Sequence, residues 1–175
     1  MTHEDAQETV RGWFTGRLPQ EWFTAPVDIT IDREEILIVG PLATPETGEA
    51  ASDAERSAAV DGRIKAFRED TRDRRIAIAR EAEHRFGRKV AWGVDCDGRR
   101  ALFTHLSVPV MTRLRQPERR VLDTLVEAGV ARSRSEALAW AVRLVGQHSE
   151  DWLRELREAM EQVRRVREQG PESTD

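Results

Sequence analysis

Serine and arginine are concentrated in one short stretch, R-S-R-S-E, at residues 132–136. Ser133 stands three residues before Glu136. This is the spacing at which a serine hydroxyl accepts from a backbone amide of a first helical turn while the glutamate reaches back to the cap amide. A helix start also gathers free N–H groups and attracts phosphate, and Arg132 and Arg134 flank this one. Two interpretations follow: a phosphate-binding site, or a structural cap with solvated arginines.

The segment just upstream has the alternation of a β-strand. In S-V-P-V-M-T-R-L-R, at residues 107–115, neighbouring side chains would point to opposite faces of such a strand. One face would carry Val108, Val110, Thr112 and Leu114. The other would carry Pro109, Met111, Arg113 and Arg115.

Two short helices are predicted after this strand. Pro117 suits a first helical turn, and the helix should close at Ala128-Gly129, where glycine can adopt the left-handed cap. A second helix should begin at Ser133. The apolar stripe of the first consists of Val121, Leu122, Leu125 and Val126, and the core stripe of the second consists of Leu138, Ala141, Val142 and Val145.

A strand, two short helices and an S-x-x-E helix start in this order resemble the ribbon-helix-helix family, bacterial DNA-binding proteins of the Arc/MetJ type, over residues 108–145. The resemblance implies a homodimer in which one strand from each chain pairs antiparallel and the ribbon enters the major groove of double-stranded DNA. It implies base contacts by Met111, Arg113 and Arg115. It also implies phosphate contacts by Arg132, Ser133, Arg134 and Ser135.

The first 106 residues predict an α-ββ-α-ββ module. A short amphipathic helix precedes a hairpin over residues 27–38, and one long helix or two consecutive helices are expected over 53–86. A second hairpin turns at Asp97-Gly98, a dipeptide that tolerates positive φ, and its second strand should run to Leu106. We therefore expect an α+β protein with three parts: this module (1–106), a ribbon-helix-helix domain (107–148) and a C-terminal segment (149–175).

The C-terminal segment predicts an amphipathic helix. Its apolar stripe consists of Trp152, Leu156, Ala159, Met160, Val163 and Val166. Such a helix is expected to pack on the body of the protein or on a partner helix. Residues 170–175 are expected to form a frayed end.

Charge is distributed unevenly along the chain. The net charge of the 175 residues is −4, yet residues 1–50 hold three arginines against ten acids, whereas residues 99–148 hold nine against four. The net negative charge discourages nucleic-acid binding, yet the second block is the most basic part of the chain. Cys96 is the only cysteine, and the sequence has no apolar run long enough for a membrane span and no secretory signal. We expect a cytoplasmic protein that does not bind membranes.

Catalytic and metal sites are not predicted. The histidines, His3, His84, His105 and His148, are scattered and match no zinc spacing with Cys96. No phosphate loop, nucleophile elbow or catalytic triad order is present. We therefore expect no enzyme, no cofactor and no metal.

Two functions remain open. The first is a homodimeric DNA-binding transcriptional regulator, which would be associated with the nucleoid because it binds DNA there. The second is a protein-interaction module of the antitoxin kind, in which the ribbon serves only dimerisation. In that case the acidic N-terminal module or the C-terminal helix would bind a partner protein.

Overall fold

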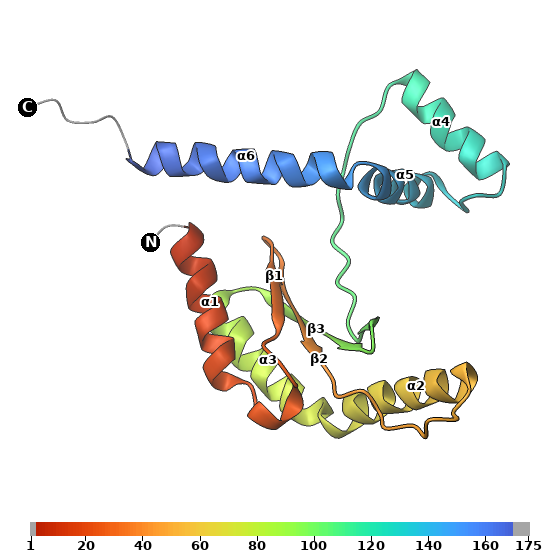
Figure 1. The fold of residues 1–175 in the computed structure, drawn as a ribbon. Helices are drawn as coiled ribbons and strands as arrows, with labels where there is room; N and C mark the ends of the chain where they lie inside the picture. The colour runs from red at the N-terminus through yellow and green to blue at the C-terminus, as the bar shows by residue number, and fades with distance from the viewer. Residues whose placement is uncertain (1–2, 170–175) are drawn as a thin grey trace, which may run out of the picture. The chain divides into compact units, whose positions relative to one another are not determined.

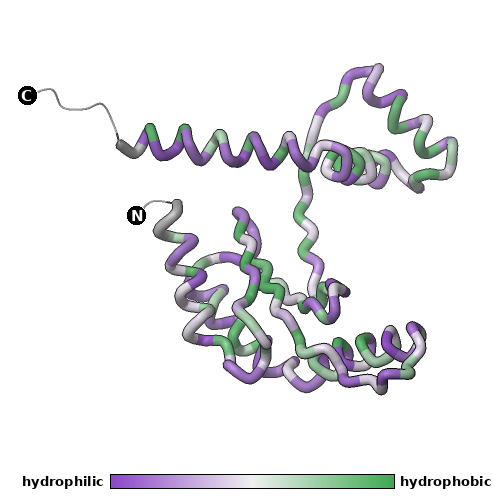
Figure 2. The backbone as a smooth tube through the Cα atoms, in the orientation of Figure 1, coloured by the Kyte–Doolittle hydropathy of each residue, from purple (hydrophilic) through white to green (hydrophobic). Residues whose placement is uncertain are grey.

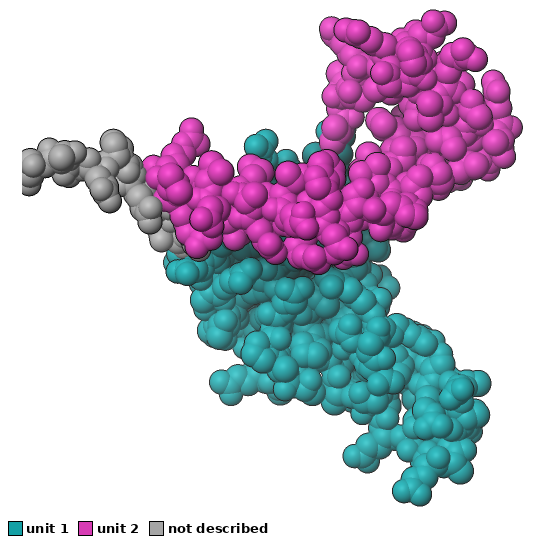
Figure 3. Space-filling model, turned by 45° about the horizontal axis from the view of Figure 1, so that its top comes forward, with its two compact units in different colours: residues 1–109 teal, residues 110–175 magenta. Residues whose placement is uncertain are grey.

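The computed structural model describes residues 3–169 and divides the chain into two compact units (Figure 3). Unit 1 comprises residues 1–109 and unit 2 comprises residues 110–175. Six α-helices and a four-stranded sheet lie among residues 3–169. The protein is therefore mixed α+β, as predicted.

Unit 1 contains the sheet and three of the helices (Figure 1). Its elements are α1 (His3–Arg17), a 3-10 helix η1 (Gln20–Trp22), β1 (Asp28–Ile31), β2 (Glu35–Pro41), α2 (Asp53–Asp70), α3 (Arg72–Phe86), β3 (Lys89–Cys96) and β4 (Arg99–Leu102). The order agrees with the predicted α-ββ-α-ββ pattern, and the second helical region is two helices that meet at Thr71.

The two hairpins join into one sheet of order β1-β2-β3-β4. The outer pairs are antiparallel, whereas β2 and β3 run parallel, with Glu35 opposite Lys89 and Pro41 opposite Asp95. A parallel pair needs a long crossover, which α2 and α3 provide. This central junction was not predicted.

The core of unit 1 lies on one face of the sheet. Ile36 and Ile38 of β2 and Trp92 of β3 occupy alternate positions, so their side chains share that face. Phe14 of α1 and Ile78 of α3 are completely or almost completely buried in the same cluster. Helices α1 and α3 therefore cover this face.

The turns of unit 1 follow their local chemistry. Asp97 and Gly98 have φ values of 55° and 74°, which confirms the predicted tight turn with positive φ. The predicted second strand is too long, because β4 ends at Leu102 and not at Leu106. The chain bends at Phe103, whose ring lies 6.3 Å from that of Phe67 in the core, and it leaves the sheet there.

Unit 2 contains three helices. They are α4 (Gln116–Glu127), α5 (Arg134–His148) and α6 (Glu150–Gln169). All three were predicted, and Pro117 lies in the first turn of α4 as expected. The small core of unit 2 lies between α4 and α5 and centres on Leu122, Ala131 and Ala137.

Candidate nucleic-acid interface

An extended segment, residues 104–115, connects β4 of unit 1 to α4 of unit 2 and has neither helix nor strand. Every residue from Thr104 to Arg113 is exposed, and Val110 and Met111 are 86% and 95% exposed. No hydrogen bond joins the backbone of residues 104–113 to another part of the described chain, residues 3–169. The predicted strand over 108–114 is therefore not formed in the single chain, because a strand requires a ladder partner.

Leu114 fastens this segment to unit 2. Its side chain is half-buried against the cluster that contains Leu122 and Ala137. Its carbonyl oxygen accepts a hydrogen bond of 2.7 Å from Nη1 of Arg119. Of the four residues predicted to share one face of the strand, only Leu114 is covered by the chain itself.

The turn between α4 and α5 forms a Schellman motif. Gly129 has a φ of 75°, its amide donates to the carbonyl of Val126 and the amide of Val130 donates to that of Leu125, both at 3.0 Å. The predicted left-handed glycine is confirmed. The turn brings Ala131 into the core, where it is 5% exposed, and so fixes the start of α5 beside α4.

Ser133 caps α5, as predicted. Its hydroxyl accepts a hydrogen bond of 3.2 Å from the amide of Glu136. The predicted return bond is different, because the Glu136 carboxylate accepts from the amide of Arg132 at 2.8 Å and not from the cap amide. The Arg132 guanidinium donates to the same carboxylate at 3.2 Å. This bond holds the carboxylate at Arg132, one residue before the cap residue Ser133.

Both arginines at this helix start are paired with acids. Arg134 donates two hydrogen bonds to the Asp123 carboxylate, at 2.6 and 2.8 Å. These bonds hold the pKa of Asp123 below its usual range, and the bond from Arg132 does the same to the pKa of Glu136. The backbone amides of Arg134 and Ser135 have no acceptor among the described residues. The amides, more than the arginines, are open to an anion.

Asp123 is a member of this group that the sequence did not reveal. It lies eleven residues before Arg134, in another helix, and no local spacing connects the two. Only the geometry of the turn between α4 and α5 brings them together. Its position on the polar side of an amphipathic helix is the sole sequence signal.

The three residues predicted to contact bases lie on the extended segment. The side chains of Met111, Arg113 and Arg115 are exposed. Within residues 3–169, neither Arg113 nor Arg115 forms a side-chain hydrogen bond or ion pair. Both guanidinium groups are therefore unpaired within the described part of the chain, and no bond there joins either of them to the start of α5.

An apolar surface remains uncovered on α4 and α5. Val121, Val142 and Val145 are each more than half exposed. The last two were predicted to belong to a buried core stripe, and this prediction is wrong for the single chain. Among the described residues of unit 2, no second layer covers them, because α4 and α5 alone enclose only a small core.

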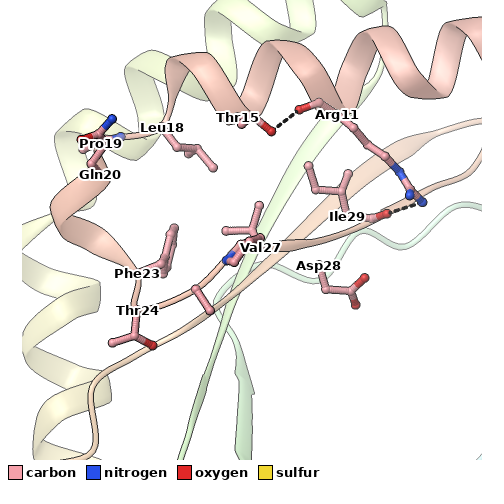
Figure 4. A pocket seen from close by; sticks show the side chains of 12 residues that line it. Arg11, Thr15, Leu18, Pro19, Gln20, Phe23, Thr24, Val27, Asp28 and Ile29 are labelled. Atoms are coloured by element: carbon pink, nitrogen blue, oxygen red, sulfur yellow. Dashed lines mark hydrogen bonds between the residues drawn. The ribbon is translucent and has the colours of Figure 1, made fainter.

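Unit 1 has a separate cavity of about 490 Å³ between α1, η1 and β1 (Figure 4). Arg11 lies at its edge and donates a long hydrogen bond of 3.5 Å to the carbonyl of Ile29. Cys96 is buried, which raises the pKa of its thiol. Among the described residues, no group of histidine, cysteine and acidic side chains has the arrangement of a metal site, and no helix has the length and apolar character to cross a membrane.

Comparisons with known proteins match both units. The family model for the N-terminal domain of Rv1265-like proteins matches residues 8–102, and that for the Mb1296 C-terminal domain matches residues 115–167. The chain is 57% identical over 160 residues to the uncharacterized proteins Mb1296 of Mycobacterium bovis and Rv1265 of Mycobacterium tuberculosis. Each alignment covers 91% of this chain and 69% of the relative. No solved structure matches the chain.

Proposed function

The chain belongs to the family of Rv1265-like proteins, and we propose that it acts as a homodimeric DNA-binding regulator of transcription of the ribbon-helix-helix type. Residues 108–114 of two chains pair antiparallel, and the resulting ribbon enters the major groove. The bound DNA places the protein on the bacterial nucleoid, in the cytoplasm.

The extended segment is the observation that carries this proposal. Its backbone carbonyls from residue 104 to residue 113, and its backbone amides except at Pro109, which has no N–H, have no partner in the described chain. Its side chains are exposed on both faces. Unpaired extended backbone is a template for another strand. A second copy supplies an identical segment, and Leu114 already fixes the end of each segment to the helices.

The uncovered valines support a dimer. Val121, Val142 and Val145 expose apolar surface on the two helices that follow the ribbon. Val108 and Val110 are also exposed, at the strand positions whose face Leu114 would share. Clustered exposed apolar side chains of this kind mark interaction surfaces. A ribbon formed by two chains would bring Val110 of each chain onto the helices of the dimer. The exposed valines of those helices would then be covered.

Charge and donor geometry support DNA as the ligand. Residues 99–148 carry nine arginines against four acids. A guanidinium such as that of Arg113 pairs with guanine through two hydrogen bonds. The open amides of Arg134 and Ser135 at the start of α5 suit a phosphate, which would set the position of the ribbon without reading sequence.

Two neighbouring substitutions test the proposal. Val110→Asp places a charge on the face predicted to be buried in the dimer, whereas Met111→Asp places the same charge on the face turned to DNA. Both side chains are almost fully exposed in the single chain, so neither change disturbs its fold. Sedimentation equilibrium and fluorescence anisotropy with genomic DNA fragments are then compared at several salt concentrations.

Val110→Asp should weaken the self-association of the chain and abolish its DNA binding. Met111→Asp should remain dimeric and bind DNA more weakly. The wild-type affinity should fall steeply with salt, because neutralised phosphates release counterions. A monomeric wild-type protein, or equal effects of the two substitutions on the dimer, would refute the paired ribbon.

The ion pairs of Arg132 and Arg134 favour a second candidate, the protein-interaction module. Both guanidinium groups are already satisfied by Glu136 and Asp123, which weakens their attraction for phosphate. In this case the ribbon dimerises the chain and a partner protein occupies another surface. A dimer sensitive to Val110→Asp that binds no DNA fragment at low salt would identify this function.

A further inference from the structure

Helix α6 carries a row of uncovered apolar side chains. Trp152, Leu156, Met160, Val163 and Val166 are exposed by between 42% and 67%. Figure 2 shows hydrophobic positions recurring among hydrophilic ones along α6. The sequence predicted such a stripe on the body of the protein or on a partner helix, and the chain itself leaves it open to solvent.

The spacing along this row is that of a two-helix seam. When Ala159, which precedes Met160, is taken as the middle position, residues 152, 156, 159, 163 and 166 follow one another at intervals of four, three, four and three, the heptad pattern that aligns one helix along another. Ala159, in the middle, is small enough for two helices to approach closely. The row therefore fits a helix as its partner better than it fits a flat surface.

The charges of α6 are separated along its axis. Residues 150–161 hold five acids and two arginines, whereas residues 162–169 hold three arginines and one acid. Two copies lying parallel would place like charges side by side, which is unfavourable. Two copies lying antiparallel would place the acidic half of each beside the basic half of the other.

We propose that α6 of two copies of this chain pair antiparallel, with the two Ala159 residues at the centre. In this register Trp152 of one copy faces Val166 of the second copy, and Leu156 lies within one residue of the position opposite Val163 of the second copy. The contact goes beyond the DNA-binding proposal and does not depend on the ribbon of residues 108–114.

Two simpler explanations account for part of the observations only. Acids near the start and arginines near the end of a helix complement its macrodipole, but this does not explain the apolar row. An anionic membrane surface would require a basic polar face. Over residues 150–169 the helix holds six acids against five arginines, so its polar face does not favour such a surface.

Disulfide trapping in the full-length protein tests this pairing. Leu156→Cys and Val163→Cys are prepared separately, one with a longer tag, and then mixed and oxidised. Cysteine is a small apolar residue, so the seam is retained. The native Cys96 is buried, and the wild type serves as the background.

The antiparallel seam predicts that the mixture forms the disulfide between the two different chains several-fold more than either variant forms a disulfide with itself. A matched control pairs Arg154→Cys with Glu161→Cys, which lie on the outer side of the heptad and should not be trapped. Self-disulfides as abundant as the mixed one would show parallel helices. A mixed yield no higher than that of the control would show no seam, and either result overturns the proposal.

Charge reversal provides a second measurement that does not disturb the seam. Replacing Arg164, Arg165 and Arg167 with glutamate in both trapping variants should reduce the mixed disulfide several-fold. If the yield does not fall, the antiparallel arrangement is wrong. Adding Val110→Asp to the trapping variants should leave the mixed disulfide in place, so failure of the ribbon and failure of the α6 pair give different results.

Discussion

The guanidinium of Arg134, at the start of α5, donates two hydrogen bonds to the carboxylate of Asp123 in α4, at 2.6 and 2.8 Å. The two parallel bonds orient the arginine as well as neutralising it. Both side chains are largely exposed, so the pair adds little to stability. Its main consequence is electrostatic, because it decides how much positive charge the start of α5 presents to an anion.

Asp123→Asn should release Arg134 and tighten DNA binding. One more free guanidinium near a phosphate makes the slope of log affinity against log salt steeper by about 0.9. Fluorescence anisotropy over a range of salt concentrations measures this slope. Asp151→Asn, which removes one of the two ion pairs of Arg154 on α6, is the control and should leave the slope unchanged. An identical slope for Asp123→Asn and the wild type would exclude Arg134 from the DNA contact.

Arg113→Ala should reduce sequence discrimination more than it reduces total binding. Loss of a bidentate contact with guanine removes about 1–3 kcal/mol of preference for the correct base. Competition between a DNA site selected from a random pool and its scrambled version measures this preference. Arg33→Ala, in the turn of the first hairpin, removes the same charge from unit 1 and should not change the ratio. Equal losses on both DNAs would make Arg113 a phosphate contact instead.

Two glycines of unit 2 should respond to alanine in opposite ways. At Gly129 the φ of 75° is unfavourable for alanine, and Gly129→Ala should destabilise the helix pair by about 1–2 kcal/mol. Gly146 lies inside α5, and Gly146→Ala should stabilise the pair by about 0.5–1 kcal/mol. An added Cβ would meet no atom within 4 Å at either position, so the difference is one of backbone conformation. Hydrogen exchange of the α4 and α5 amides measures both changes.

Glu35→Gln should stabilise unit 1 at neutral pH. The Oε2 atom of Glu35 is buried without a hydrogen-bond partner, and burial, assisted by the charge of Asp32, raises the pKa of the carboxyl. A carboxyl with a raised folded-state pKa contributes stability when protonated, and this contribution is lost as the pH rises through that pKa. The variant should therefore melt at a higher temperature than the wild type at pH 7.

The advantage of Glu35→Gln should vanish as the pH falls below about 4, where the wild-type carboxyl is protonated in both states. Thermal unfolding followed by circular dichroism at a series of pH values records the difference. Glu34→Gln, at the exposed neighbouring position, is the control for the loss of one negative charge. A constant difference between the Glu35 variant and the wild type at all pH values would contradict the assigned cause.

Local sequence patterns predicted the helices and strands. They did not predict which strands pair with one another when those strands lie far apart along the chain. The stripe around Leu122 and the cap at Ser133 are properties of neighbouring residues, so α4 and α5 followed from the sequence. The parallel pairing of Glu35 with Lys89 joins residues far apart along the chain, and neither strand specifies its partner. For residues 108–114, the alternation of side chains predicted the two faces of a strand. It did not supply the partner strand that a ladder needs, and the single chain leaves this segment unpaired.

The parallel pairing of β2 with β3 also affects how the protein is made. The two central strands are separated by the whole of α2 and α3, so a chain emerging from the ribosome can complete the first hairpin but not the sheet. Until residues 89–96 leave the exit tunnel, Ile36 and Ile38 have only part of their final surroundings. The first hairpin must therefore wait, with β2 incompletely covered, until residues 89–96 have been synthesised.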